Sequence, residues 1–365
     1  MDVTLTVEAL GPQLSGIGRY VWELCSRVPQ QPGIDRLNFF ANGRFVDGPQ
    51  AQLHGNSARS HIRMPRWMRR RRTLRRLRQS LVHGPNYFLP GAVETGIITV
   101  HDLSVFKYPE THPAERLRAF ERDFEHSLSR AEHVITDTET VRREVIGEFG
   151  LAEAKVTAIP LGVGYEYRPR GGDEIQPHVA PFGLAPGGYA LSVSTLEPRK
   201  KISELIGAWR ELPQDLRSST PLVLAGAKGW LNENLHDEVR EGVAAGWLRH
   251  LGFVPEEALL ALYSGASLFI YPSVYEGFGL PPIEAMASGV PVLVANRSCL
   301  PEVSGDAAGY IDPDDPNAFS QAIAEALTDS AWRSQAREKG LERAAKFSWD
   351  RCAAQTAELY QRYRP

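Results

Sequence analysis

The sequence predicts an α/β protein with two domains, each built on a parallel sheet between helices. At 365 residues the chain is longer than one typical hydrophobic core supports. Short apolar runs alternate with helical patterns along nearly its whole length, as in a doubly wound sheet. A stretch rich in glycine and proline over residues 168–188 separates the halves. We therefore expect an N-terminal domain over residues 1–170, a linker over 171–188, a C-terminal domain over 189–348 and a last helix within 349–365.

Composition excludes several classes of protein. Hydrophobic residues make up 42% of the chain and charged residues 23%, which is ordinary for a globular protein. No apolar run reaches the length of a membrane span, and residues 1–7 lack the basic-then-apolar pattern of a signal peptide. Cys25, Cys299 and Cys352 are scattered, which argues against a disulfide framework or a zinc site and favours a reducing cytoplasm.

The first domain is expected to begin with a strand over residues 3–7, because these residues are mostly apolar. A turn containing Gly16 and Gly18 follows, and residues 19–28 continue as an amphipathic helix. Many α/β folds begin in this way, so a simple tight turn and a binding loop are both consistent with the pattern. Further strands are predicted over residues 37–41, 96–100 and 133–136, and further helices over residues 116–130 and 138–149.

Positive charge concentrates in one segment of the N-terminal half. Residues 1–180 carry 24 Lys and Arg against 21 Asp and Glu, whereas the remaining residues carry 17 against 23. Nine arginines lie within residues 63–78, among them Arg69, Arg70, Arg71 and Arg72. Apolar contacts of Trp67, Leu74 and Leu77 would make this segment a basic amphipathic helix.

Three interpretations of the arginine-rich segment remain open. It is a solvated helix face, a surface for anionic lipid head groups or a lipid-diphosphate acceptor, or a surface for nucleic acid. Clustered arginine beside tryptophan favours the lipid interpretation. No nucleic-acid-binding motif accompanies the segment, which argues against the third.

Two polar residues, His101 and Asp102, follow the predicted buried strand over residues 96–100. Ligands collect at the carboxyl ends of strands in an open α/β sheet, which would place both side chains at the edge of a binding cleft. A hydrogen bond that closes the loop is the alternative explanation of the pair.

The second domain is expected to open with a strand over residues 189–194, followed by Arg199 and Lys200. Arginine offers paired planar donors and lysine a point charge, and both suit a diphosphate. The alternative is the start of a lysine-rich helix. Further strands are predicted over residues 222–225, 248–254, 267–271, 291–295 and 309–312.

A stretch in the middle of the second domain has the pattern of an anion site. The strand over residues 267–271 leads into a glycine loop, and Pro281 and Pro282 then open a helix. The first N–H groups of a helix lack intrahelical acceptors and point at whatever occupies the loop. Because proline has no N–H, the donors narrow to the region of Gly277, Phe278, Gly279 and Leu280.

Two carboxylates, Glu276 and Glu284, bracket this loop. Acids that face phosphate oxygens would be repelled, so they would instead accept hydrogen bonds from hydroxyl groups. A nucleotide sugar has hydroxyls at both ends and a diphosphate in the middle. The residues by themselves favour such a ligand and a surface loop with a capping carboxylate about equally.

Residues 272–289 have the sequence Pro-Ser-x-Tyr-Glu-Gly-Phe-Gly-Leu-Pro-x-x-Glu-Ala-Met-Ala-x-Gly. This sequence closely resembles the signature of family 4 retaining glycosyltransferases. The resemblance covers almost the whole chain and is strongest from residue 189 onward. It implies the GT-B fold, in which two Rossmann-like domains face each other across a cleft and the C-terminal helix crosses back to the first domain. His-Asp-Leu at 101–103 and Leu-Glu-Pro-Arg-Lys at 196–200 resemble a mannosyltransferase-like branch.

The resemblance implies roles for the candidate residues. Glu276, His101 and Lys200 would serve the reaction: Glu276 and His101 contact the transferred sugar, and Lys200 neutralises the diphosphate. Asp102 either orients His101 or takes part in acceptor binding. The donor would also contact Glu284 through its ribose, the amides of the loop that holds Gly277, Phe278, Gly279 and Leu280, the glycine turn with Gly16 and Gly18, and the backbone near Phe253.

One departure from the family pattern concerns the arginine. Many members have Gly-Arg-Leu where this chain has Ser194-Thr195-Leu196, so Arg199 would have to supply the guanidinium. The expectation for Lys200 is therefore firmer than the expectation for Arg199.

These observations predict a retaining hexosyltransferase that needs no metal or other cofactor, with GDP-mannose as the first candidate donor. The acceptor would be a glycan or a lipid-linked acceptor of surface polysaccharide biosynthesis, with no nucleic-acid partner. The protein would be cytoplasmic and peripheral at the inner face of the membrane through residues 63–78. The alternatives are a nucleotide-sugar epimerase or hydrolase on the same fold, and a non-catalytic adaptor that uses residues 63–78.

Overall fold

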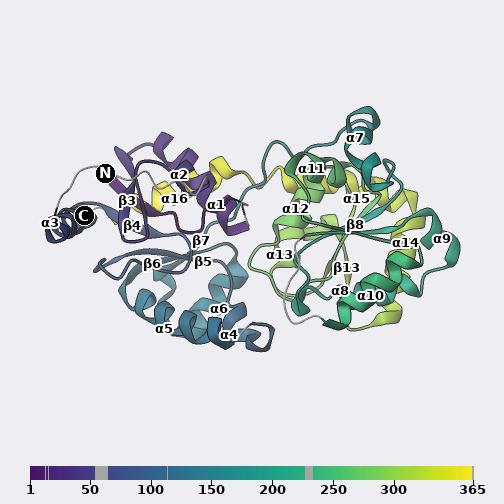
Figure 1. Cartoon of the computed structure of the whole chain (residues 1–365), viewed down its shortest axis with the longest axis horizontal. Coiled ribbons are helices and arrows are strands. Elements are labelled where there is room, and N and C mark those ends of the chain that lie inside the picture. Colours follow the sequence, from purple (N-terminus) through teal and green to yellow (C-terminus); the bar gives the residue numbers. More distant parts are fainter. Residues whose placement is uncertain (13, 15, 54–64, 113, 227–232, 364–365) are drawn as a thin grey trace. The chain divides into compact units, whose positions relative to one another are not determined.

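The computed structural model describes residues 1–12, 14, 16–53, 65–112, 114–226 and 233–363. Contacts divide the chain into two compact units, and each is an α/β sheet with flanking helices (Figure 1). The first unit comprises residues 1–105, 113–162 and 348–365, and the second comprises residues 106–112 and 163–347.

The sheet of the first unit has the strand order β3-β2-β1-β4-β5-β6-β7, and its pairs are parallel except β2 with β3. The chain runs outward from β1 in both directions, so the order reverses between β1 and β4. Open α/β sheets bind ligands at such a switch point. The strands are β1 (Asp2–Thr6), β2 (Arg36–Ala41), β3 (Arg44–Val46), β4 (Leu81–Gly84), β5 (Gly96–Val100), β6 (Ala131–Thr136) and β7 (Val156–Ala158).

Helix α16 (Trp349–Gln361) belongs to the first unit, although it follows the second in the sequence. Two histidines of the sheet hold its end: His83 Nδ1 lies 2.6 Å from the hydroxyl of Tyr360, and His133 Nδ1 lies 2.7 Å from that of Tyr363. Burial lowers the pKa of His83 to about 3 and that of His133 to about 4, so both rings are neutral at neutral pH. The other helices of the unit are α1 (Gly16–Arg27), α2 (Gln50–Leu53), α3 (Arg66–Arg78), α5 (Ala114–Arg130) and α6 (Glu139–Phe149), with 3-10 turns at Val28–Gln30 and Glu153–Lys155.

The sheet of the second unit is parallel throughout and has the order β10-β9-β8-β11-β12-β13. Counted from β8, this is the 3-2-1-4-5-6 order of the Rossmann fold, with the switch point between β8 and β11. The strands are β8 (Ala190–Val193), β9 (Leu222–Ala225), β10 (Leu248–Gly252), β11 (Leu268–Tyr271), β12 (Val292–Ala295) and β13 (Ala308–Ile311).

Helices cover the second sheet and bury a core that includes Trp209, Leu268 and Phe319. The helices are α7 (Gly172–Val179), α8 (Ile202–Arg210), α9 (Gln214–Ser219), α10 (Glu233–Ala244), α11 (Glu256–Gly265), α12 (Leu280–Ala287), α13 (Leu300–Ser304), α14 (Pro316–Thr328) and α15 (Ser330–Ala344). Short 3-10 turns lie at Pro109–Thr111, Ala180–Phe182, Pro198–Lys200 and Gly305–Ala307, and α4 (Ser104–Lys107) spans the boundary between the units. Two Rossmann-like sheets in one chain confirm the predicted fold class.

The segment expected to be a linker, residues 171–188, differs from that expectation. It contains helix α7, which packs against α11 and buries Ile175 and Val179, one turn apart. Glycines and prolines indicate breaks at the ends of this segment, whereas the apolar pair between them favours a short packed helix. The segment is therefore a packed part of the second unit.

Within the residues that the structure describes, no helix combines the length and the apolar character needed to cross a bilayer.

Candidate functional site

The predicted donor residues of the second unit lie at the switch point of its sheet. Lys200 ends the 3-10 turn that follows β8, and Glu276 lies in the loop between β11 and α12. Because β8 and β11 are adjacent and parallel, the loops at their carboxyl ends share one edge of the sheet. The fold thus brings together two side chains that are 76 residues apart in the sequence.

The carboxylate of Glu276 is held by four side chains. Its Oε1 accepts hydrogen bonds from Lys200 Nζ, from the Tyr271 hydroxyl at 2.9 Å and from the Ser273 hydroxyl at 2.5 Å. Arg199 Nη1 lies 3.4 Å from the same oxygen. Within the described residues these contacts all involve Oε1, so Oε2 is left to accept from a ligand.

Opposing effects set the charge of this cluster. Burial by itself raises the pKa of Glu276, but Lys200 and Arg199 lower it to about 2, so the side chain is a carboxylate at neutral pH. Burial lowers the pKa of Lys200, although Glu276 partly opposes this. Glu197 also pairs with Arg199 at 3.2 Å. The two cations and two carboxylates balance, so the cluster carries no formal net charge.

The two loops also hold each other through their backbones. The N–H of Val274 donates to the carbonyl of Arg199 at 3.0 Å, and Arg199 Nη1 donates to the carbonyl of Tyr275 at 2.8 Å. The position of Glu276 is therefore fixed by the 3-10 turn that carries Lys200.

The glycine loop ends in the first turn of α12, as predicted. Gly279 has φ +89°, and a Cβ there would lie 2.8 Å from the Leu300 side chain, so only glycine fits without a shift. Since Pro281 and Pro282 have no N–H, the amides at and before Leu280 are the donors left without an intrahelical acceptor. The side chain of Phe278 packs against Phe347, so this residue can offer a ligand only its backbone.

The second carboxylate, Glu284, lies about one turn into α12 and is half-buried. Its Oε2 accepts a hydrogen bond of 2.8 Å from the hydroxyl of Tyr263 on α11. The amides that open α12 thus lie between two carboxylates, each oriented by a tyrosine hydroxyl.

Sequence reasoning missed two residues that support Glu276 from the loop between β12 and α13. The Ser298 hydroxyl donates to the carbonyl of Glu276 at 2.8 Å and accepts from its N–H at 3.3 Å, and Cys299 Sγ donates to the same carbonyl at 3.0 Å. Ser298 has φ +54°, an uncommon conformation for a residue with a side chain. No local pattern pairs residues 22 positions apart; only the shared sheet edge does.

We expect Ser298→Ala to lower about 10-fold the turnover of any reaction that uses the Glu276 carboxylate, because two hydrogen bonds to the Glu276 peptide are worth roughly 1–2 kcal/mol. Affinity for the nucleoside diphosphate should change little, since the hydroxyl contacts only the peptide of Glu276. Ser298→Gly, which removes the same bonds and relieves the positive φ, should lose a similar amount. The control is Ser218→Ala at an exposed position. Wild-type turnover in both Ser298 variants would show that the residue has only a structural role.

In the first unit, His101 lies at the carboxyl end of β5 with both ring nitrogens bound within the protein. Nδ1 is 2.8 Å from Asp137 Oδ2, and Nε2 donates to the carbonyl of Pro85 at 2.9 Å. Burial alone lowers the pKa of His101, but the Asp137 carboxylate outweighs it and raises the pKa above its usual value. A sugar hydroxyl could therefore bind a ring nitrogen only by displacing one of these partners.

Asp137, rather than the predicted Asp102, is the carboxylate that orients His101. Asp102 Oδ1 instead accepts from the N–H of Ser104 at 2.8 Å, so this side chain holds the loop that follows β5. Asp137 follows β6 just as His101 follows the neighbouring strand β5, and that shared strand-end position was the available signal. Gly16 and Gly18 lie in the first turn of α1, and residues 13 and 15 before this helix lie outside the described part.

Two other predictions concern surface residues. Phe253 follows the edge strand β10, and 59% of its surface is exposed. In the sheet, β9 separates β10 from β8, the strand that precedes Lys200. The side chains of residues 69–72 are exposed on α3, whereas residues 63 and 64 lie outside the described part. Trp67 was expected to make an apolar contact, and this expectation is wrong, because 61% of its surface is exposed. Leu77 provides the buried contact.

Comparisons with known proteins agree with this geometry. Residues 14–167 match the family model described as Glycosyltransferase Family 4, and residues 185–343 match the one described as Glycosyl transferases group 1. The chain is 38% identical to the O-antigen chain mannosyltransferase B of Escherichia coli, over 99% of this chain and 100% of that protein. It is 32% identical to the E. coli serotype-specific mannosyltransferase WbdA, over 72% of this chain and 32% of that protein.

Among solved structures, the chain is similar to Anabaena Alr3699/HepE in complex with UDP-glucose, with a TM-score of 0.73 over 99% of each chain. The sequences are 16% identical, so this likeness concerns the fold.

Proposed function

Because the chain belongs to glycosyltransferase family 4 and has the GT-B fold of these transferases, we propose that it transfers mannose from GDP-mannose, with retention, to a glycan or lipid-linked acceptor of a surface polysaccharide. The observation that carries the proposal is the buried Lys200–Glu276 pair beside the first amides of α12. Sequence similarity over nearly the whole chain to a protein named an O-antigen chain mannosyltransferase supports mannose as the sugar and a surface polysaccharide as the type of acceptor.

Breaking the anomeric bond builds positive charge on the sugar and negative charge on the departing diphosphate. Two of the three N–H bonds of Lys200 Nζ go to Tyr271 and Glu276, which leaves the third for a phosphate oxygen. This ammonium, the Arg199 guanidinium and the α12 amides stabilise the departing charge without a metal. Glu276 Oε2 accepts from a sugar hydroxyl, and Glu284 accepts from the ribose diol.

Retention follows from attack on the face that the diphosphate leaves. The bond from the anomeric carbon to the phosphate oxygen breaks, and the acceptor oxygen forms its bond to the same carbon on the same side. The departing phosphate takes the proton of the acceptor hydroxyl. The carboxylate of Glu276, already bound by four side chains, serves as a hydrogen-bond acceptor in this reaction rather than as a nucleophile.

The donor is tested by the thermal stability of the protein with GDP, UDP, ADP and dTDP. A ligand at 100 times its Kd adds about 2.7 kcal/mol to the free energy of unfolding, so the preferred base gives the largest rise in Tm. We expect GDP to rank first, and GDP-mannose with a mannose-terminated acceptor to give an α-linked product by NMR. A larger rise with UDP or dTDP would contradict the donor, and epimerised or hydrolysed sugar nucleotide without acceptor would favour the isomerase or hydrolase alternative.

We also propose that the protein is cytoplasmic and binds the inner face of the membrane through α3. Leu77 is buried, and Arg76 donates to Asn38 at 2.9 Å, so the C-terminal part of this helix is fixed to the first unit. Its N-terminal part exposes Trp67, Met68 and the four arginines of residues 69–72. Arginines beside an exposed aromatic side chain suit a surface of anionic lipid.

Replacing Arg69, Arg70, Arg71 and Arg72 together by glutamine should weaken binding to anionic vesicles on the order of 1000-fold, since each basic residue contributes about 1 kcal/mol near such a surface. Vesicle co-sedimentation measures this. Four exposed arginines elsewhere, Arg118, Arg122, Arg143 and Arg240, provide the matched control. Equal loss in both quadruple variants, or in neither, would contradict a role specific to α3.

A further inference from the structure

A cavity of about 850 Å³ lies in the first unit at the amino ends of its strands. Leu81 opens β4, Thr95 precedes β5 and Lys155 precedes β7, and all three line the cavity. His101 lies at the opposite end of β5, about 16 Å away along a strand of five residues. Within the first unit the cavity is therefore separate from His101, and every residue that lines it belongs to this unit.

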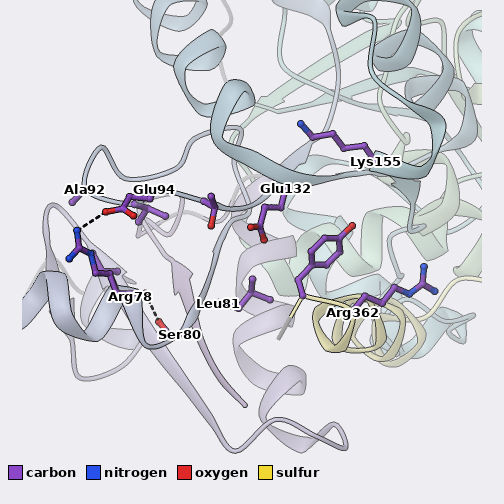
Figure 2. A pocket seen from close by; sticks show the side chains of 12 residues that line it. Arg78, Ser80, Leu81, Ala92, Glu94, Glu132, Lys155 and Arg362 are labelled. Carbon is purple, nitrogen blue, oxygen red and sulfur yellow. Dashed lines mark hydrogen bonds and ion pairs between the residues drawn. The ribbon is translucent and has the colours of Figure 1, made fainter. Parts of the chain in front are cut away.

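Cationic and anionic side chains both line this cavity. Figure 2 shows Arg78 and Glu94 on one side and Glu132, Lys155 and Arg362 on the other. Arg78 pairs with Glu94 at 2.6 Å, and Arg362 pairs with Glu358 at 3.5 Å. Glu94 and Glu132 would repel a phosphate, so this mixture of charges suits a neutral ligand better.

A neutral polyol fits the lining better. Sugar hydroxyls both donate and accept, and the cavity offers carboxylates that accept, cations that donate, and the hydroxyl of the exposed Thr95 that does either. Leu77, Leu81 and Val93 add apolar surface for the C–H faces of a pyranose ring. The volume lies within the range of sites that bind small molecules, and it exceeds what a single water cluster needs.

We propose that this cavity binds a neutral oligosaccharide and is a second site for the acceptor glycan, away from the point of transfer. The inference rests on the proposed function, because it takes the acceptor to be a polymer. A glycan held at two sites binds the second one as an intramolecular event, so a long acceptor gains apparent affinity that a short one cannot. The cavity would then favour elongation of chains that already carry several sugar units.

The test compares a short α-mannose oligosaccharide with a long α-mannan as acceptors. Ala92 is exposed in the turn before β5 and lines the cavity, so Ala92→Trp fills it, and Glu132→Gln removes one acceptor charge. We expect Ala92→Trp to raise the KM for the long acceptor at least 10-fold and to leave the KM for the short acceptor and kcat unchanged; Glu132→Gln should change the same KM in the same direction. Ala180→Trp, at an exposed position of the second unit, controls for an added tryptophan.

A binding measurement separates failure of this inference from failure of the proposed function. Affinity electrophoresis through gels that contain α-mannan reports binding without any transfer, and Ala92→Trp should be retarded less than wild type and Ala180→Trp. Equal retardation of all three proteins, or an equal rise of KM for both acceptors, would overturn the inference. Loss of binding to anionic vesicles by Ala92→Trp with unchanged retardation would instead assign the cavity to a lipid head group and would also overturn it.

Discussion

Replacing Lys200 by alanine is expected to lower the rate of sugar transfer on the order of 100-fold, because a charge-assisted contact to the departing diphosphate contributes about 2–4 kcal/mol to lowering the barrier. Lys200 Nζ is buried, is held by Tyr271 and Glu276, and retains one N–H for a phosphate oxygen. Affinity for the neutral nucleoside should change little, since that part of the donor lies beyond the ammonium. Single-turnover rates and equilibrium binding of the nucleoside measure the two quantities.

Two further variants control for this substitution. Lys200→Met keeps the length of the side chain and should lose as much activity as Lys200→Ala, which separates lost charge from lost volume. The neighbouring Lys201 pairs with Glu204 and Asp314, so Lys201→Ala should retain activity. Unchanged turnover in Lys200→Met would refute the role of the ammonium.

Glu276→Gln is expected to lower turnover by more than 100-fold. The amide keeps the shape of the side chain but removes the charge that both Lys200 and Arg199 face, and it weakens the acceptor offered to the sugar hydroxyl. Losing a hydrogen bond to a charged group costs about 1.5–3 kcal/mol, and the buried Lys200 ammonium left without its carboxylate adds to this. Transfer assays at saturating donor measure the effect, and an active Glu276→Gln enzyme would contradict the role of the carboxylate.

The same substitution has a consequence for the pH dependence of stability. The pKa of Glu276 is about 2 in the folded chain and 4.5 ordinarily, so the unfolded chain binds the proton first as the pH falls. The stabilisation from this carboxylate is complete above pH 4.5 and is lost as the pH falls toward 2, with about 2 kcal/mol lost by pH 3. Wild type should therefore lose more unfolding free energy between pH 6 and pH 3 than Glu276→Gln. Equal losses in the two proteins, measured by urea denaturation, would contradict the ion pair.

The regular elements could be predicted because each depends on local periodicity. The strand at Gly96–Val100 follows from a short apolar run, and the helix that ends at Arg130 follows from helical spacing. The segment with α7 was missed because its glycines and prolines outweighed one apolar pair, Ile175 and Val179. Composition marks where regular structure is interrupted, but a short helix within such a stretch depends on a partner, here α11, that the local sequence does not show.

The candidate site could be predicted as a set of residues but not as a set of contacts. A glycine loop, a helix start and flanking acids are local features, and so is a lysine after a strand. That Lys200 donates to Glu276, that Ser298 holds the Glu276 peptide, and that Asp137 rather than Asp102 binds His101 depend on strand order. Those pairs become visible only once parallel strands set their carboxyl ends side by side.

The most direct test is a crystal structure of the protein with GDP-mannose or GDP. We expect a pyrophosphate oxygen about 3 Å from Lys200 Nζ, further phosphate oxygens on the amides that open α12, and Glu284 on the ribose hydroxyls. A diphosphate bound elsewhere on the second unit, with the Lys200–Glu276 pair intact and no phosphate oxygen near it, would show that this pair does not bind the donor.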